Sequence, residues 1–328
     1  MATQEINIAG AGIFGLSVAW ALLRRGVRVR VSDPAPIAAR TSGGIVGALS
    51  PHVPENWNDK KAFQFQSLVM AHAYWEDVAR ASDLPTGYAR LGRLQPLADD
   101  KAVELARRRA VTAQELWRGE AVWQVIAADG TAWEPPSPTG MLVRDTLSAH
   151  IHPRLAITAL SRAIEAGGGV FGPRVEAPTV WAIGRADPLV TGVKGQAALF
   201  DFDARGMPQI FADSVHIIPH LDGTTAVGST SERVWENDGP DALLDGVIAR
   251  ARAAVPSLET ARVIERWAGV RPRAKSRAPM LGPHPDKPGD FIANGGFKIG
   301  FGMAPLVGDV MADLIVEGRD VIPEAFRA

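Results

Sequence analysis

The sequence predicts a mixed α/β fold, and three stretches of the chain carry that prediction. A short apolar strand, a glycine turn, a helix and a second strand follow one another over residues 5–33, an order typical of a doubly wound parallel sheet. Strand, glycine turn and helix recur in that order over residues 291–316. Between these stretches, residues 210–219 and 224–232 have the composition of strands in an antiparallel sheet.

Size and charge exclude several classes of protein. The 328 residues suffice for about two lobes, and 46% hydrophobic with 22% charged residues is an ordinary globular composition. A formal net charge of −1 creates no overall field that would attract nucleic acid. The absence of cysteine excludes disulfides, thiolate metal sites and cysteine nucleophiles. We find neither a basic leader nor the ~18 consecutive apolar residues of a membrane span, and therefore expect a cytoplasmic protein.

The glycine turn GAGIFG at 10–15 is typical of a dinucleotide-binding site. Gly10 allows the tight turn, Gly12 lets the backbone approach a phosphate, and Gly15 lets the helix pack closely on the strand. Leu16 to Arg25 have helical periodicity, and the N-terminus of that helix offers free N–H groups and a positive dipole end to a pyrophosphate. Ile13 and Phe14, within the turn, are expected to contact the cofactor as well. Asp33 follows 18 residues after Gly15, where a carboxylate can accept hydrogen bonds from ribose hydroxyls.

The remaining elements follow from periodicity and from breaking residues. Apolar spacing predicts helices over about 60–82, 99–118, 240–254 and 303–316. His152, Pro153 and Arg154 open another helix, which runs to Ala166 and ends at the glycines 167–169. The segment 134–140 predicts a loop, and 179–183 and 210–219 each predict one strand.

Two distant segments decide the cofactor, because the glycine turn alone suits NAD or FAD equally. Residues 40–50 are small and hydroxyl-bearing, so they can lie under a long flat cofactor and bond its oxygens. In residues 294–305, glycines again precede a helix, whose N–H groups can face the flavin edge that gains negative charge on reduction. The sequence therefore predicts FAD, held by these segments through Arg40, Thr41, Ser42, Gly47, Ala48, Leu49, Gly296, Phe297, Lys298, Ile299, Gly300 and Phe301.

Several of these motifs together resemble the D-amino acid oxidase-like flavoproteins, the group of glycine oxidase, D-amino acid dehydrogenases and sarcosine oxidase. The resemblance spreads over most of the chain, from the glycine turn through IHPRL (151–155), GVKGQ (192–196), HIIP (216–219) and WAGVRPRAKSRAPMLG (267–282) to GGFKIGFGMAP (295–305). It implies an FAD-binding domain of doubly wound type, interleaved with a substrate domain on a mixed, largely antiparallel sheet. The implied boundaries are 1–80, 145–185 and 262–328 for the FAD domain, and 81–144 and 186–261 for the substrate domain.

The resemblance also implies the chemistry and the residues that perform it. In such enzymes the α-hydrogen of a small amine or amino acid leaves as hydride to flavin N5, and the imine hydrolyses. Arg271 matches the residue that grips the substrate carboxylate, although the neighbouring basic run at 273–277 also suits a solvated strand edge. Lys298 is expected either beside that carboxylate or near the flavin, where it would raise oxygen reactivity. His216, and less specifically His52, suit either a substrate contact or a structural role. The electron acceptor, oxygen or a quinone, stays open.

The chain departs from the family pattern between residues 170 and 183, where a short segment replaces the usual small meander. Val175 is expected to present its backbone to adenine, and Gly184 to stand in the flavin-contacting strand end. Three alternatives remain: oxidation of a carboxymethylaminomethyl group on a tRNA uridine, a nicotinamide-dependent dehydrogenase, and a non-catalytic flavin-binding module. For the first, a basic patch at 107–109 would contact RNA.

Overall fold

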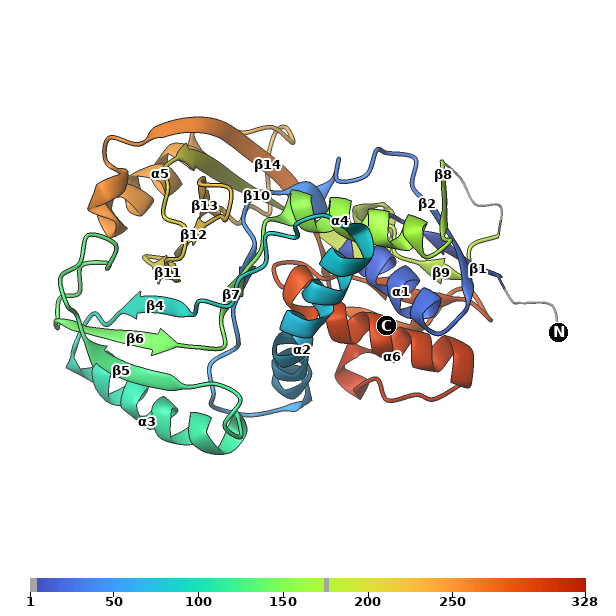
Figure 1. Ribbon diagram of the computed structural model, residues 1–328, viewed down its shortest axis with the longest axis horizontal. Helices are drawn as coiled ribbons and strands as arrows, with labels where there is room; N and C mark the ends of the chain where they lie inside the picture. The colour runs from blue at the N-terminus through green and yellow to red at the C-terminus, as the bar shows by residue number, and fades with distance from the viewer. Residues whose placement is uncertain (1–4, 174–176) are drawn as a thin grey trace.

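The computed structural model describes residues 5–173 and 177–328 and divides into two lobes (Figure 1). Its first elements are strand β1 (Glu5–Ala9), helix α1 (Ile13–Arg24) and strand β2 (Arg28–Ser32). β1 and β2 pair in parallel from Glu5 opposite Arg28 to Ala9 opposite Ser32. The predicted parallel unit is therefore confirmed.

A six-stranded sheet forms around this unit, in the order β15-β16-β9-β1-β2-β8 within the described chain. All neighbours in it are parallel except the hairpin of β15 and β16. The four added strands are β8 (Val170–Gly172), β9 (Val180–Trp181), β15 (Met280–Pro283) and β16 (Phe291–Asn294). The carboxyl ends of β1, β2, β9 and β16 meet at one edge of the sheet, which is where such folds bind their ligands.

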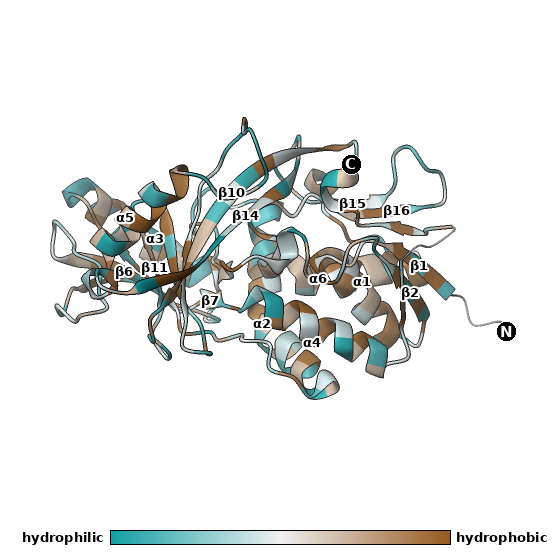
Figure 2. Cartoon of the chain, turned by 90° about the horizontal axis from the view of Figure 1, so that it is seen from above, coloured by the Kyte–Doolittle hydropathy of each residue, from teal (hydrophilic) through white to brown (hydrophobic). Residues whose placement is uncertain are grey.

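Four helices pack in this lobe: α1, α2 (Asp59–Ser82), α4 (Pro153–Ala166) and α6 (Gly300–Glu317). α1 contacts α4, α6 and the sheet, so it is apolar on every side over Ile13–Leu22 and appears largely brown in Figure 2. The entry of α4 is shaped by Pro153 in its first turn and by His152, whose ring nitrogen Nδ1 accepts a hydrogen bond from the Leu155 N–H.

The other lobe is built on an eight-stranded sheet, in the order β14-β10-β13-β12-β11-β4-β6-β5 among the strands described. Its neighbours are antiparallel except for β4 and β11, which run parallel. Helices α3 (Asp100–Leu116) and α5 (Leu243–Ala254) cover it. The strands are β4 (Arg93–Pro96), β5 (Trp123–Ala127), β6 (Met141–Asp145), β10 (Val190–Asp201), β11 (Gln209–Ala212), β12 (Val215–Pro219), β13 (Thr225–Gly228) and β14 (Arg262–Ala274).

Within the eight-stranded sheet, β10 and β14 form a long antiparallel ribbon that reaches toward the six-stranded sheet (Figure 2). Their register runs from Val190 opposite Ala274 to Asp201 opposite Arg262. At its inner end, an isolated bridge joins Arg273 to Gly296, in the segment that leads into α6. The ribbon thereby connects the two lobes beside the edge where the parallel strands end. A separate two-stranded sheet pairs β3 (Ala48–Leu49) with β7 (Ala149–His150).

The structure corrects several expected elements. Residues 210–219, predicted as one strand, form β11 and β12, because Asp213 and Ser214 adopt positive φ values of 46° and 61° and turn the chain. α1 and α6 begin earlier than predicted, since the residues of each glycine turn already form the first helical turn. Of the strand expected at 179–183, only Val180–Trp181 is paired. The division of the chain into two domains with the boundaries given above stays a prediction.

Candidate active site

The glycine turn after β1 owes two of its glycines to close packing. Gly10 has a φ of +106°, and a Cβ there would overlap the carbonyl of Ala182 at the end of β9. A Cβ on Gly15 would overlap the carbonyl of Gly10. A Cβ on Gly12 would lie 3.3 Å from the Ser42 hydroxyl, in the space that a phosphate approaches. The turn therefore brings α1 tightly against β1 and leaves its N-terminus open to a ligand.

The N-terminus of α1 is framed by two side chains from the following segments. The Ser42 hydroxyl accepts a hydrogen bond from the Ile13 N–H at 3.1 Å, and Asp33 accepts one from the Ala11 N–H at 3.1 Å. Arg40 lies 3.8 Å from Asp33, measured from its Nε to Oδ1. This end of the site thus presents N–H dipoles, a hydroxyl, a carboxylate and a guanidinium, the groups that a ribose and a pyrophosphate need.

A cavity of about 960 Å³ extends from Asp33 and Arg40 to Phe211 and His216. Its volume is at the upper end of the ~300–1,000 Å³ range of ligand pockets, which suits a long cofactor together with a substrate. One wall is the edge of the six-stranded sheet at which its parallel strands end. The opposite wall comes from the eight-stranded sheet, mainly from β14. Small residues line much of the middle, including Gly44, Gly47, Ala48 and Ala182.

A second glycine segment closes the cavity before α6. Gly296 has no room for a side chain, because a Cβ there would lie 2.9 Å from the Phe14 ring and 3.1 Å from the Gly300 Cα. Phe297 adopts a φ of 44°, and its N–H donates to the Pro272 carbonyl at 3.1 Å. No side chain caps the described start of α6, so its first N–H groups and its positive dipole end face the cavity. Two open helix termini and two glycine turns on one cavity fit FAD.

Arg271 on β14 lies at the far end of this cavity and is only 9% exposed. Its Nη2 donates to the Ser229 hydroxyl at 2.7 Å, and its Nη1 donates to the Thr230 carbonyl at 3.3 Å. Among the described residues, no carboxylate lies within ion-pairing distance of it. Burial lowers the pKa of Arg271 to about 10, against the opposing effect of Glu232, so it is a cation at neutral pH. Arg271, the first residue of the basic run 271–277, is therefore buried in the cavity wall and does not lie on a solvated strand edge.

Lys298 and His216 line the same end of the cavity. Burial and the nearby charge of Arg271 lower the pKa of Lys298, and its ammonium lies 5.7 Å from the centre of the Phe297 ring. Burial lowers the pKa of His216 to about 3, and the charges of Arg93 and Lys298 lower it further in the same direction. The His216 ring lies 4.6 Å from that of Phe211, and its Nδ1 has no hydrogen-bond partner in the described structure. His216 is thus a neutral ring in the cavity wall, and its Nδ1 is buried behind that wall.

The structure brings together most of the residues expected from the sequence. The cavity is lined by Arg271, His216, Lys298, Gly12, Ile13, Phe14, Asp33, Arg40, Thr41, Ser42, Gly47, Ala48, Gly184, Gly296, Phe297, Ile299, Gly300 and Phe301. Gly10 and Gly15 lie behind its wall, where they serve the packing described above. Leu49 is fully buried in the main core, because β3 turns its side chain inward. Val175 lies outside the described residues.

Two other expected sites have local partners. The His52 side chain is exposed outside the cavity and contacts Gln64 through Nδ1. In the basic patch at 107–109, Arg109 binds Glu55 through two hydrogen bonds of 2.6 and 2.9 Å, and Arg108 pairs with Glu104 at 2.7 Å. At least two of the three arginines are thus matched by carboxylates, which leaves the patch with little charge for RNA.

Sequence reasoning missed several residues of the cavity wall. Phe211 lies on β11 and Ser214 in the turn between β11 and β12, a stretch that was expected to be continuous strand. Trp267 and Ser229 lie on or beside the long ribbon. Residues 224–232 were expected to be strand, with no role for Ser229. Its contact with Arg271 depends on β10, β13 and β14 lying side by side, which the sequence alone does not reveal.

A cavity at the carboxyl ends of parallel strands, with a second sheet as its far wall, is the arrangement of enzymes that hold a dinucleotide cofactor in one part and a substrate against the other. The chain belongs to the FAD dependent oxidoreductase (DAO) family, whose sequence profile matches residues 5–187 and 177–314. The cofactor is accordingly FAD rather than a nicotinamide, and the protein is an enzyme rather than a non-catalytic flavin-binding module.

Individual relatives agree along the whole chain. Over 375 aligned residues the chain is 25% identical to a glycine oxidase of Bacillus licheniformis, covering 98% of this chain and 96% of that protein. The crystal structure of glycine oxidase from Geobacillus kaustophilus matches with a TM-score of 0.82 at 20% identity, covering 99% of this chain and 98% of that one. That of iminodiacetate oxidase from Chelativorans sp. BNC1 matches with a TM-score of 0.81 at 21% identity, covering 98% of each chain.

These relatives place the protein in the glycine oxidase and D-amino acid oxidase-like group, whose members carry out FAD-dependent amine oxidation. Within residues 5–173 and 177–328, no helix is long and apolar enough to cross a membrane.

Proposed function

We propose that the protein oxidises the C–N bond of a small amino acid, a glycine-like compound, a D-amino acid or an N-substituted glycine, with FAD as oxidant. The observation that carries this proposal is the state of Arg271. A buried guanidinium that faces a cavity without a carboxylate partner in the described structure is costly, and a carboxylate ligand removes that cost. The glycine oxidases among the relatives supply the same substrate class independently.

Arg271 is suited to bind a carboxylate in a defined orientation. Its guanidinium has five N–H donors, of which two are used by Ser229 and Thr230. The remaining donors form a planar fork that matches the two oxygens of a carboxylate, so the amine end of the substrate would be directed along the cavity. Orientation of this kind supplies a large part of the rate enhancement when the protein contributes no strong base.

His216 and Lys298 would complete the substrate end. Neutral His216 lines the substrate end of the cavity and adds no positive charge that would repel the substrate amine. Lys298 adds a second cation near Arg271, which favours the carboxylate end of the substrate there. FAD, when bound, would supply the hydride acceptor for the substrate α-hydrogen. The imine product then hydrolyses in water.

The test is anaerobic reduction of the yellow, FAD-loaded protein by a panel of amines, followed by admission of air. We expect glycine, sarcosine or a D-amino acid to bleach the visible flavin absorption, while the same amines without a carboxylate do not. Reoxidation by air or by a quinone then identifies the electron acceptor. A yellow protein that stays oxidised with the whole panel would overturn the substrate proposal and leave the cofactor unaffected.

A further inference from the structure

Arg271 does not lie along its own strand but reaches across the neighbouring one. It belongs to β14, and its hydrogen-bond partners Ser229 and Thr230 lie on the opposite side of β10, in the segment that continues β13. The side chain passes over Gly195 of β10, where any Cβ would overlap the guanidinium. The position of Arg271 therefore depends on where residues 229–232 lie relative to β10.

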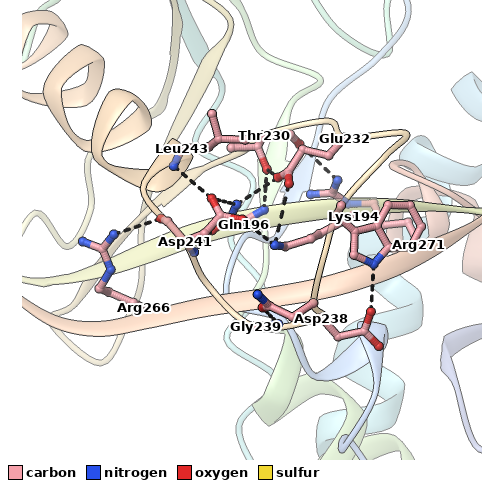
Figure 3. Close-up of polar contacts among 12 residues, drawn as sticks. Lys194, Gln196, Thr230, Glu232, Asp238, Gly239, Asp241, Leu243, Arg266 and Arg271 are labelled. Atoms are coloured by element: carbon pink, nitrogen blue, oxygen red, sulfur yellow. Dashed lines mark hydrogen bonds and ion pairs between the residues drawn. The ribbon is translucent and has the colours of Figure 1, made fainter.

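A buried polar network on the other face of β10 holds that segment (Figure 3). Lys194 and Gln196 flank Gly195, so strand alternation points their side chains away from the face that Arg271 crosses. Both are fully buried. The Lys194 ammonium donates to Asp241 at 2.6 Å and lies 3.7 Å from Glu232, while the Gln196 amide donates to Asp241 at 2.7 Å and to Glu232 at 3.0 Å.

The network continues directly to the partners of Arg271. The Thr230 hydroxyl contacts the Glu232 carboxylate and accepts a hydrogen bond from the Gln196 N–H at 2.9 Å. The backbones of Lys194 and Glu232 exchange hydrogen bonds of 3.0 and 2.9 Å. Side chains and backbone thus fix residues 230–232 against β10, and the carbonyl of Thr230 then receives Arg271 from the opposite face.

The charges of the network also match the site. One ammonium, Lys194, faces two carboxylates, Glu232 and Asp241, so the cluster carries one uncompensated negative charge. Arg271 has no contacting carboxylate among the described residues, and Glu232 stabilises its charged form from across the strand. Glu232 therefore offsets part of the cost of the buried guanidinium from across the strand, and it occupies none of the donors that remain for a substrate.

We propose that Lys194 and Glu232 are positioning residues for the substrate carboxylate: they act through residues 229–232 to hold the guanidinium of Arg271 over Gly195. This inference rests on the proposed function, in which Arg271 binds that carboxylate. The competing explanation is that Lys194 and Glu232 only stabilise the fold, because removing one partner of a buried ion pair is destabilising.

The experiment measures the Kd of acetate, a carboxylate without an amine, from the change in visible absorption of the FAD-loaded protein. The variants are Lys194→Met, which removes the ammonium, and Glu232→Gln, which keeps the shape of the side chain. Arg271→Met is the benchmark for complete loss of the anchor. Val247→Ala, which truncates a fully buried side chain of α5 in the same lobe, is the control for lost stability.

We expect Lys194→Met and Glu232→Gln to raise the Kd of acetate and the KM of the amine substrate roughly tenfold, with kcat changed much less, because a charge-assisted bond loses its geometry. Val247→Ala should lower Tm and leave both constants unchanged. The inference fails if both network variants bind acetate as tightly as wild type, or if Val247→Ala weakens acetate equally. If Lys194→Met does not fold, Glu232→Gln decides. Wild-type affinity in Arg271→Met would instead refute the proposed function itself.

Discussion

At the scale of single residues, the cavity carries two cations that the described part of the chain leaves without carboxylate partners. Arg271 and Lys298 both line its far end, and each raises the cost of charging the other. A carboxylate ligand would offset the repulsion between the buried Arg271 and the more exposed Lys298. Because Lys298 lines the same end of the cavity as Arg271, we expect it to contact the substrate rather than the flavin.

The first prediction concerns Lys298→Met. We expect the KM of the carboxylate-bearing substrate to rise about tenfold, the value of one lost charge-assisted hydrogen bond, and the rate of flavin reoxidation by oxygen to stay within about twofold. Steady-state kinetics and stopped-flow reoxidation separate the two effects. A slowed reoxidation at unchanged KM would place Lys298 beside the flavin instead. Lys287→Met is the control, because that ammonium lies 4.5 Å above the Trp181 ring and outside the cavity lining.

Much of the cavity lining could be predicted from residue types and motif positions, but part of it could not. Arg271, His216 and Lys298, which line the cavity, were expected there because their motif positions can be matched without knowledge of strand pairing. Ser229, Trp267 and Phe211 were missed because their exposure to the cavity follows from which strands are neighbours. The side chain of Leu49 lies in the core and not in the cavity lining for a related reason: the alternation of β3 points it inward, which the composition of its segment does not reveal.

At the scale of elements, β10 leaves room for Arg271 because its residue 195 is a glycine. Gly195 is paired with Gly269 of β14, and the two glycines leave the surface over which Arg271 and Trp267 lie. A Cβ on Gly269 would come within 2.5 Å of the Trp267 ring. Glycine weakens a strand, so two of them opposite one another in a ribbon indicate close approach of other groups.

The second prediction is that Gly195→Ala displaces Arg271 and leaves the fold intact. We expect KM to rise at least tenfold with FAD content unchanged, because the methyl group occupies the space of the guanidinium. Gly246→Ala is a matched control: it lies in α5 with nothing within 4 Å of its Cβ, and it should raise stability by up to about 1 kcal/mol without altering kinetics. Equal kinetics for both variants would contradict the prediction.

The elements themselves were predictable to the extent that their signals are local. β1, α2 and α4 were found within a residue, because apolar period, Pro153 and the glycines after Ala166 mark them. β10 and β14 were not predicted as strands, since residues such as Lys194, Gln196 and Arg271 interrupt an apolar pattern when they are satisfied by partners far along the chain. The break at Asp213 and Ser214 was missed because neither residue is a glycine.

At the scale of the whole molecule, the cavity lies between the two lobes, so its ligand contacts both. A ligand that binds only the folded state stabilises it by an amount set by its concentration. The third prediction is that removal of FAD lowers Tm, and that FAD at about 100 times its Kd restores about 2.7 kcal/mol. Differential scanning fluorimetry provides the measurement and NADH the control. A Tm that is equal with and without FAD would show that the cavity does not hold the cofactor.

The fourth prediction concerns acid stability, and three buried histidines carry it. Burial lowers the pKa of His150 to about 4, that of His220 to about 4 and that of His216 to about 3. In the unfolded chain each histidine has a pKa near 6.5. Between that pH and about 4, the unfolded state therefore binds more protons than the native state. Stability should therefore fall as pH drops from about 6.5 toward 4, by up to about 1.4 kcal/mol per pH unit for each histidine.

Urea unfolding at several pH values measures this slope. His150→Leu should reduce it, because both nitrogens of the fully buried His150 are unpartnered in the described structure. His72→Gln should not, since the His72 side chain is 61% exposed. A slope that is the same in wild type and His150→Leu would mean that His150 does not contribute to acid lability.

The ribbon of β10 and β14 also determines where this chain can change its length during evolution. Trp267, Gly269 and Arg271 share one face of β14, and an inserted or deleted residue between 267 and 271 would turn every later side chain to the opposite face. Insertions beyond the outer end of the ribbon, past Asp201 and before Arg262, leave that phase intact. We therefore expect the lengths of homologous chains to vary in the outer connections of the eight-stranded sheet, while the spacing from residue 267 to 271 stays constant.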